Sequence, residues 1–118
     1  MWQIETTDCF DEWFADLEED GRVEIRAKVE LLRLLGPRLG RPHADTLKDS
    51  KHANLKELRA DTANAVLRVA FAFDPKRTAL LLVAGNKAGV GQRRFYKQLI
   101  AQADELFDAH LAQLKDQD

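Results

Sequence analysis

The sequence predicts an α+β fold in which helices pack on one face of an antiparallel sheet. Three observations support this: an early strand is followed by two amphipathic helical segments, three later segments alternate with period two, and the last segment returns to a helical period. The order βααβββα groups the strands of a meander, which is typical of the α+β class. A chain of 118 residues can bury one core, so we expect a single domain over residues 1–118.

The N-terminal segment predicts a short strand and then a helix. Residues 2–6 alternate apolar and polar side chains, which is typical of a strand. Thr7 or Asp8 can cap the following helix, because both carry a side-chain oxygen that accepts a backbone N–H. The apolar residues of that helix fall at i, i+3, i+4 and i+7, and so on one face: Phe10, Trp13, Phe14 and Leu17.

A second helix is expected after a break at Asp20-Gly21. Ile25, Val29 and Leu32 share one face of it, and Gly36-Pro37 ends it. The two helices are expected to form an antiparallel hairpin. Residues 37–54 have no clear period and are expected to be an ordered loop.

Three strands and a final helix complete the expected fold. The strands span about residues 54–59, 65–74 and 78–85, and short turns between them predict a meander. In the middle strand the large residues face the helices, which places Arg68 on the opposite face among small neighbours. The last helix runs from Gln92 to about Leu114, with Ile100, Ala103, Phe107, Leu111 and Leu114 on one stripe.

The net charge of −2 conceals a strong separation of charge along the chain. Residues 1–20 carry eight acidic and no basic residues, whereas residues 54–97 carry nine basic and three acidic residues. A local cationic excess attracts phosphate and favours a nucleic-acid partner. A merely solvated surface is an equally open interpretation of the charge cluster alone.

Several function classes lose support. No stretch approaches the roughly 18 apolar residues of a membrane helix, and residues 1–20 lack the basic start of a secretory signal, so a cytoplasmic protein without a membrane partner is expected. The lone Cys9 cannot form an internal disulfide. The histidines are isolated and the glycines match no nucleotide-binding loop, so neither a metal site nor a cofactor is expected.

What remains is a constellation of basic residues with one tyrosine. Arg59, Arg68, Lys87 and Tyr96 can converge, because the three strands are neighbours and the last helix follows the third directly. We take these four as candidate catalytic residues of a metal-independent ribonuclease, in which the 2′-hydroxyl attacks the adjacent phosphorus. Further candidate RNA contacts are Lys56, Arg93, Arg94 and Lys97.

The four candidates divide into two roles. Arg59 and Arg68 fit the neutralisation of phosphoryl charge, because a guanidinium presents two donors to a phosphate. Arg68 is therefore expected to serve the chemistry rather than the fold. Lys87 or Tyr96 could transfer the proton, and Tyr96 could instead stack on a base or simply pack. Period two places Lys56 on the sheet face opposite Arg59.

The arrangement resembles the HigB-like branch of the RelE/ParE toxin superfamily of type II toxin-antitoxin systems. The likeness rests on the strands Leu-Lys-Glu-Leu-Arg59, Val-Leu-Arg68-Val-Ala-Phe and Leu-Leu-Leu-Val-Ala-Gly-Asn-Lys87, together with length and element order. It implies a RelE-like fold and a toxin that cuts mRNA on the ribosome through Arg59, Arg68 and Lys87. The resemblance also implies a cognate antitoxin as a partner, expected to be a helix-turn-helix protein encoded beside the toxin.

The chain departs from the family pattern after Lys87. Many relatives have a Lys-Lys pair followed by Thr-x-x-Thr-Pro, whereas here Lys87 is followed by Ala-Gly-Val-Gly. The identity of the proton-transferring residue therefore stays open. Two alternatives to the nuclease also stay open: a non-enzymatic toxin that inhibits a protein such as DNA gyrase, and an inactive RNA-binding domain.

Overall fold

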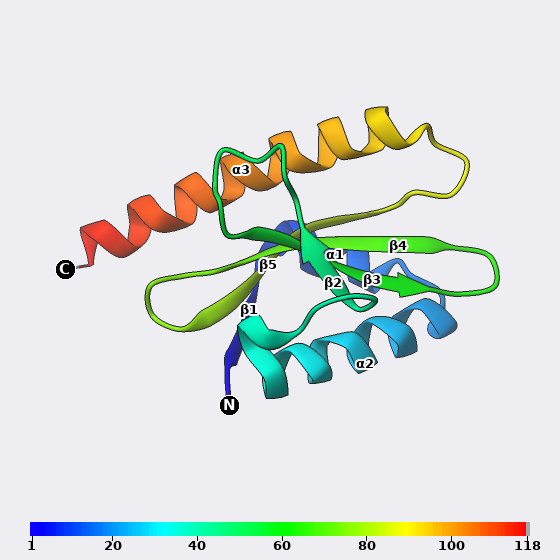
Figure 1. Ribbon diagram of the computed structural model, residues 1–118, viewed down its shortest axis with the longest axis horizontal. Coiled ribbons are helices and arrows are strands. Elements are labelled where there is room, and N and C mark those ends of the chain that lie inside the picture. The colour runs from blue at the N-terminus through cyan, green and yellow to red at the C-terminus, as the bar shows by residue number, and fades with distance from the viewer. Residues whose placement is uncertain (118) are drawn as a thin grey trace.

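The computed structural model describes residues 1–117 as one five-stranded sheet between two layers of helices (Figure 1). The strand order is β1-β5-β4-β3-β2. The elements in chain order are β1 (Gln3–Thr6), α1 (Asp8–Ala15), α2 (Glu19–Leu35), the short 3-10 helix η1 (Gly36–Arg38), β2 (Ala44–Thr46), β3 (Leu55–Asp61), β4 (Val66–Phe73), β5 (Thr78–Asn86) and α3 (Gln92–Asp116). The predicted α+β class is confirmed.

The predicted meander is present as β3, β4 and β5, which pair antiparallel. Two further strands extend it. β1 runs parallel to β5, so the sheet is mixed, and β2 pairs antiparallel with β3. The expectation of a loop over residues 37–54 is therefore wrong in part, because η1 and β2 lie there. β2 has only three residues, which are too few to show an alternating pattern in the sequence. It is a strand because it pairs with β3.

The first two helices cover one face of the sheet. Thr7 caps α1 as predicted, since its hydroxyl accepts a bond from the Phe10 N–H at 3.1 Å. The expected break at Asp20-Gly21 is displaced: the chain leaves the helix at residues 16–18, and Gly21 lies inside α2. Gly21 is buried close to Leu67, where a Cβ would lie 3.4 Å from a Leu67 methyl, so this position suits close packing of helix on sheet.

The last helix covers the opposite face, which corrects the expectation that all helices pack on one face (Figure 1). Strands β4 and β5 are buried on both sides, so their alternation separates two cores rather than a core and a solvent side. Beneath α1 and α2 lie residues such as Val69 and Leu81. Beneath α3 lie the alternate residues, including Ala70, Ala72 and Leu82, packed against Phe95, Leu99, Ile100, Ala103 and Phe107.

The segment between β2 and β3 is fastened to α3. Ser50 donates a hydrogen bond to Asp104 at 2.5 Å, and His52 Nε2 lies 2.8 Å from an oxygen of Asp108. Lys51 also pairs with Asp108. This segment therefore stands beside α3 and forms a wall on the α3 side of the sheet. None of the helices within residues 1–117 is long and apolar enough to cross a membrane.

Candidate active site

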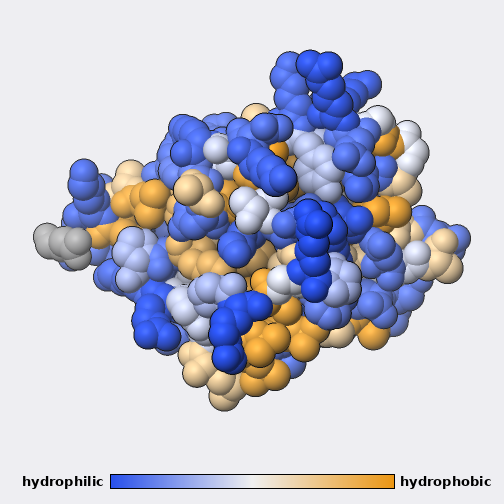
Figure 2. All heavy atoms as spheres, in the orientation of Figure 1, coloured by the Kyte–Doolittle hydropathy of each residue, from blue (hydrophilic) through white to orange (hydrophobic). Residues whose placement is uncertain are grey.

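An open cleft of about 1040 Å³ lies on the α3 side of the sheet, between the start of α3 and the segment around β2. Its walls come from elements distant in sequence, and hydrophilic side chains project from the start of α3 (Figure 2). The basic residues that line it are Arg41, Lys48, Arg59, Arg68, Lys87, Arg93 and Lys97, and the acidic ones are Asp45, Asp49, Glu57 and Asp104. The lining is therefore predominantly cationic.

A buried carboxylate forms the centre of the cleft floor. Glu57 is only 3% exposed. The Tyr96 hydroxyl donates to its Oε1 at 2.7 Å, and Arg59 Nη2 lies 3.2 Å from its Oε2. On the neighbouring strand Arg68 Nε lies 3.7 Å from Oε1. The sheet register explains this convergence, because Arg59 is directly opposite Arg68 and Glu57 shares the face of Arg59.

Arg68 is buried and only partly satisfied. Its Nη1 donates to Asp61 Oδ1 at 2.7 Å and to the Leu67 carbonyl at 2.8 Å. Its Nε is buried and has no hydrogen-bond partner among the described residues. Burial lowers the pKa of Arg68, but the hydrogen bond to Asp61 and the neighbouring Tyr96 outweigh burial, and the net effect is a raised pKa. Arg68 is therefore a fixed positive charge with an unused donor.

Tyr96 stands in the first turns of α3 between the carboxylate and a lysine. Burial, and then the hydrogen bond to Glu57, raise the pKa of Tyr96, so its hydroxyl keeps its proton at neutral pH. Lys87 Nζ lies 5.3 Å from the centre of the Tyr96 ring. The helix reaches this position because Gly85 lacks a side chain: a Cβ there would lie 3.1 Å from the Phe95 ring.

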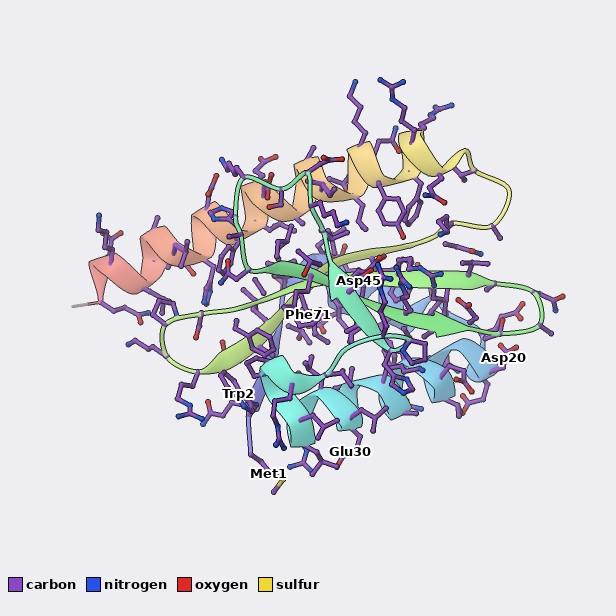
Figure 3. The ribbon with its side chains drawn as sticks, in the orientation of Figure 1. Met1, Trp2, Asp20, Glu30, Asp45 and Phe71 are labelled. Carbon is purple, nitrogen blue, oxygen red and sulfur yellow. The ribbon has the colours of Figure 1, made fainter. Side chains whose placement is uncertain are left out.

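A second carboxylate, Asp45, lies at the rim of the cleft on β2 (Figure 3). Arg59 Nη2 is 3.3 Å from its Oδ2, and Arg41 Nη2 is 2.8 Å from the same oxygen. The bond from Arg41, followed by the Thr46 N–H, holds the pKa of Asp45 below its ordinary value. Asp45 and Glu57 are register partners, so their side chains share the face that Arg59 occupies.

The structure brings together most of the residues that the sequence nominated. Six of them line the cleft: Arg59, Arg68, Lys87, Tyr96, Arg93 and Lys97. Lys56 does not, because its neighbours Leu55 and Glu57 face α3 and its own side chain points to the α2 side, as period two requires. Arg94 is exposed on α3 and does not line the cleft either.

Sequence reasoning did not nominate Glu57, Arg41 or Asp45, which make the contacts described above. Glu57 carried a usable signal, since it lies two positions before Arg59 and therefore on the same strand face. Arg41 and Asp45 gave no comparable signal, because they lie where no period was visible. Within residues 1–117, no three His, Cys, Asp or Glu side chains gather in a group that could hold a metal ion.

The family profile described as "Phage derived protein Gp49-like (DUF891)" matches residues 12–108, which is most of the chain. The chain belongs to this Gp49-like family. Two relatives from Mycobacterium tuberculosis are named as candidate toxins. The first, HigB2, is 43% identical over 105 residues, which cover 88% of this chain and 52% of HigB2. The second, HigB3, is 42% identical over 100 residues, which cover 85% of each chain.

This Gp49-like chain thus spans about half the length of the first relative and most of the second. Among solved structures, a double arginine-to-alanine mutant of the E. coli toxin RelE in the free state superposes with a TM-score of 0.61. That match covers 85% of this chain and 94% of RelE at 8% identity, so it bears on the fold alone. The expected likeness to HigB and the RelE-like fold are confirmed.

Proposed function

We propose that this Gp49-like protein is the toxin of a type II toxin-antitoxin system and cuts mRNA at the ribosome. The observation that carries the proposal is the cleft in which Arg59, Arg68, Lys87 and Tyr96 surround the buried carboxylate of Glu57. The relatives named as toxins support the biological role. The cleft supports the chemistry, because it combines phosphate-binding guanidinium groups with groups that can transfer a proton.

The scissile phosphate is proposed to sit over the paired arginines. The two guanidinium groups come from opposite positions of β3 and β4, and the rigid sheet holds them in place. As the 2′-oxygen bonds to phosphorus, charge grows on the non-bridging oxygens, and preorganised donors stabilise it without reorganisation. Arg59, whose side chain is 32% exposed, can donate to such an oxygen, whereas the buried Arg68 adds a fixed positive charge beneath it.

Proton transfer is proposed to run through Tyr96 and Lys87. The 2′-hydroxyl passes its proton to the Tyr96 oxygen while the phenol proton moves to Glu57, 2.7 Å away. The O2′–P bond forms and the P–O5′ bond breaks, and the Lys87 ammonium gives a proton to the departing 5′-oxygen. The products are a 2′,3′-cyclic phosphate and a 5′-hydroxyl. No step in this scheme requires a metal ion.

The implied partners follow from this role. The toxin would meet ribosomes and mRNA in the cytoplasm, and a cognate antitoxin, which we expect to be a helix-turn-helix protein, would hold it inactive. The cationic cleft is a natural target for an acidic antitoxin segment, since electrostatic complementarity guides association. Residues 1–118 are proposed to act as one domain.

The experiment compares induced expression of the wild type with two lysine variants. Lys87→Gln removes a cation from the cleft, whereas Lys56→Gln removes a cation from the opposite side of the sheet and serves as the matched control. Wild type and Lys56→Gln should arrest growth and create new mRNA ends inside coding regions, with 2′,3′-cyclic phosphates. Lys87→Gln should lose both effects by at least about tenfold.

Other results would reject the proposal in distinct ways. Growth arrest with intact transcripts and accumulating DNA breaks would indicate an inhibitor of a protein such as DNA gyrase. New ends that carry 3′-hydroxyls and 5′-phosphates would exclude attack by the 2′-hydroxyl. Equal loss of activity in both lysine variants would show that general charge, rather than this cleft, determines toxicity.

A further inference from the structure

Two guanidinium groups converge on one carboxylate oxygen at the rim of the cleft. Arg41 approaches Asp45 Oδ2 through Nε at 2.9 Å and Nη2 at 2.8 Å, and Arg59 Nη2 approaches the same oxygen at 3.3 Å. The three side chains come from three places in the chain: the turn before β2, β2 itself and β3. The Asp45 carboxylate thus occupies the point where the two guanidinium groups meet, a position that also suits an oxygen of a phosphate.

Arg41, Arg59 and Arg68 differ in how far their side chains are exposed to solvent. Arg68 is 9% exposed at its side chain and lies on the floor, whereas Arg59 is 32% and Arg41 71% exposed. The guanidinium groups therefore rise from the floor to the rim in the order Arg68, Arg59, Arg41. A flexible chain of phosphates entering the cleft would meet more than one of them, and a guanidinium binds phosphate and carboxylate oxygens in the same way.

We propose that Arg41 and Arg59 form a second phosphate position beside the scissile one, and that Asp45 occupies this position in the free protein and yields it to RNA. The inference rests on the proposed function, because it names how the RNA of that reaction is held. In this arrangement Asp45 is a built-in counterion. It keeps the two guanidinium groups oriented until a backbone phosphate replaces its carboxylate.

A phosphate can replace the Asp45 carboxylate because the contact of Asp45 with Arg59, at 3.3 Å, is longer than its contact with Arg41, at 2.8 Å. Asp45 Oδ1 is anchored by the Thr46 N–H at 2.9 Å, so the carboxylate can stay near β2 while Oδ2 gives up its partners. Arg59 remains held by Glu57 Oε2 at 3.2 Å when Asp45 departs. The guanidinium group of Arg59 thus keeps its position on the sheet while its outer donor turns to the incoming phosphate.

A purely structural role for Asp45 makes the opposite forecast. Arg41 and Asp45 are four residues apart around the turn that leads into β2, and their contact could serve only to hold that turn. In that case removal of the carboxylate would loosen Arg41 and Arg59 and weaken RNA binding. If Asp45 is a counterion that RNA displaces, its removal strengthens binding.

The test uses a single-stranded 2′-O-methyl RNA oligonucleotide, which keeps the phosphates but has no 2′-hydroxyl to attack. Binding to the full-length protein is measured over a range of salt concentrations for the wild type, Asp45→Asn and Arg41→Gln. The matched control is Glu30→Gln, which removes a carboxylate from the exposed Arg33–Glu30 pair on α2 and changes the net charge equally. Cleavage of mRNA on ribosomes is followed in parallel.

Asp45→Asn should bind about two- to fivefold more tightly than the wild type, the range expected from freeing one partly exposed ion pair. Its plot of log affinity against log salt should keep the wild-type slope, because the same phosphate contacts Arg41 and Arg59 in both proteins. Arg41→Gln should bind more weakly with a shallower slope, and Glu30→Gln should match the wild type.

The inference is overturned if Asp45→Asn binds as the wild type does or more weakly, or if Arg41→Gln leaves binding and slope unchanged. It is also overturned if the wild type does not bind the oligonucleotide. When the wild type still cleaves mRNA on ribosomes, these results reject only the second phosphate position. Absence of cleavage by the wild type would reject the proposed function itself.

Discussion

Replacement of Tyr96 by phenylalanine isolates the hydroxyl that links substrate and carboxylate in the proposed proton relay. The ring that packs against Phe95 and Lys87 stays in place, and the 2.7 Å bond to Glu57 is lost. General acid–base catalysis contributes about 10² to 10⁴ in rate, so the activation barrier should rise by roughly 2.7 to 5.5 kcal/mol.

The same substitution should cost much less in stability. A hydrogen bond to a charged group contributes about 1.5 to 3 kcal/mol, and the value here should lie near the lower end because Glu57 keeps Arg59 as a partner. For a chain of 118 residues this lowers Tm by roughly 4 to 8 °C. The fold should therefore survive while the chemistry fails.

The assay is single-turnover cleavage of mRNA on ribosomes, with Tm measured on the same preparations. Thr7→Val is the matched control: it removes the cap of α1, which costs about 1 kcal/mol, at a position outside the cleft. The control should lose a similar amount of stability and keep its cleavage rate. A folded Tyr96→Phe variant that cleaves within tenfold of the wild type would refute the proton relay.

Three further predictions concern the arginines and the turn after α2. Arg68→Ala should abolish cleavage and also lower the free energy of unfolding by about 2 kcal/mol in urea titrations. The stability falls because the substitution removes the buried guanidinium and its two hydrogen bonds, to Asp61 and to the Leu67 carbonyl. An unchanged free energy of unfolding would contradict a structural role for this buried side chain. The lowered pKa of Asp45 stabilises the fold above its unfolded pKa of about 4, and this contribution is lost as pH falls through the lower folded value. Arg41→Gln should therefore flatten the loss of stability below about pH 4, as measured by unfolding at a series of pH values, whereas an unchanged curve would reject the assigned cause. Gly36→Ala should lower Tm without changing the cleavage rate per folded molecule, since its φ is +55° and a Cβ would lie 2.1 Å from the Trp2 indole nitrogen; a wild-type Tm would show that the indole moves freely.

The fold was predictable wherever one period ran long enough to be recognised. The three meander strands and α3 follow from alternation and from a helical stripe, and the structure places them within a few residues of expectation. The face of the sheet that α3 covers was not predictable from the apolar stripe of the helix. Such a stripe shows which face of the helix is buried, but it does not show which face of the sheet the helix packs against. The small residues Ala70 and Ala72 of β4 were the available signal, since a solvent face would have carried more polar side chains.

The site residues on the central strands β3 and β4 were predictable from the sequence, whereas those in and before the short edge strand β2 were not. Arg59 and Arg68 came from strand register, which alternation fixes. Glu57 was not nominated as a site residue, although its strand position places it on the same face as Arg59. Arg41 and Asp45 depend on β2, whose pairing is set by contact with β3 rather than by local pattern. Arg68 was expected to serve chemistry alone, but its burial gives it a structural role as well.

The pairing of β1 with β5 also sets the order in which the protein can fold during its own synthesis. β1 (Gln3–Thr6) is synthesised well before its neighbour β5, which begins at Thr78, so β1 has no strand to pair with until β5 has been made. The cleft needs Tyr96 from α3, which emerges later still. The cleft is therefore assembled late, because it is complete only once α3 has been made and has packed on the sheet.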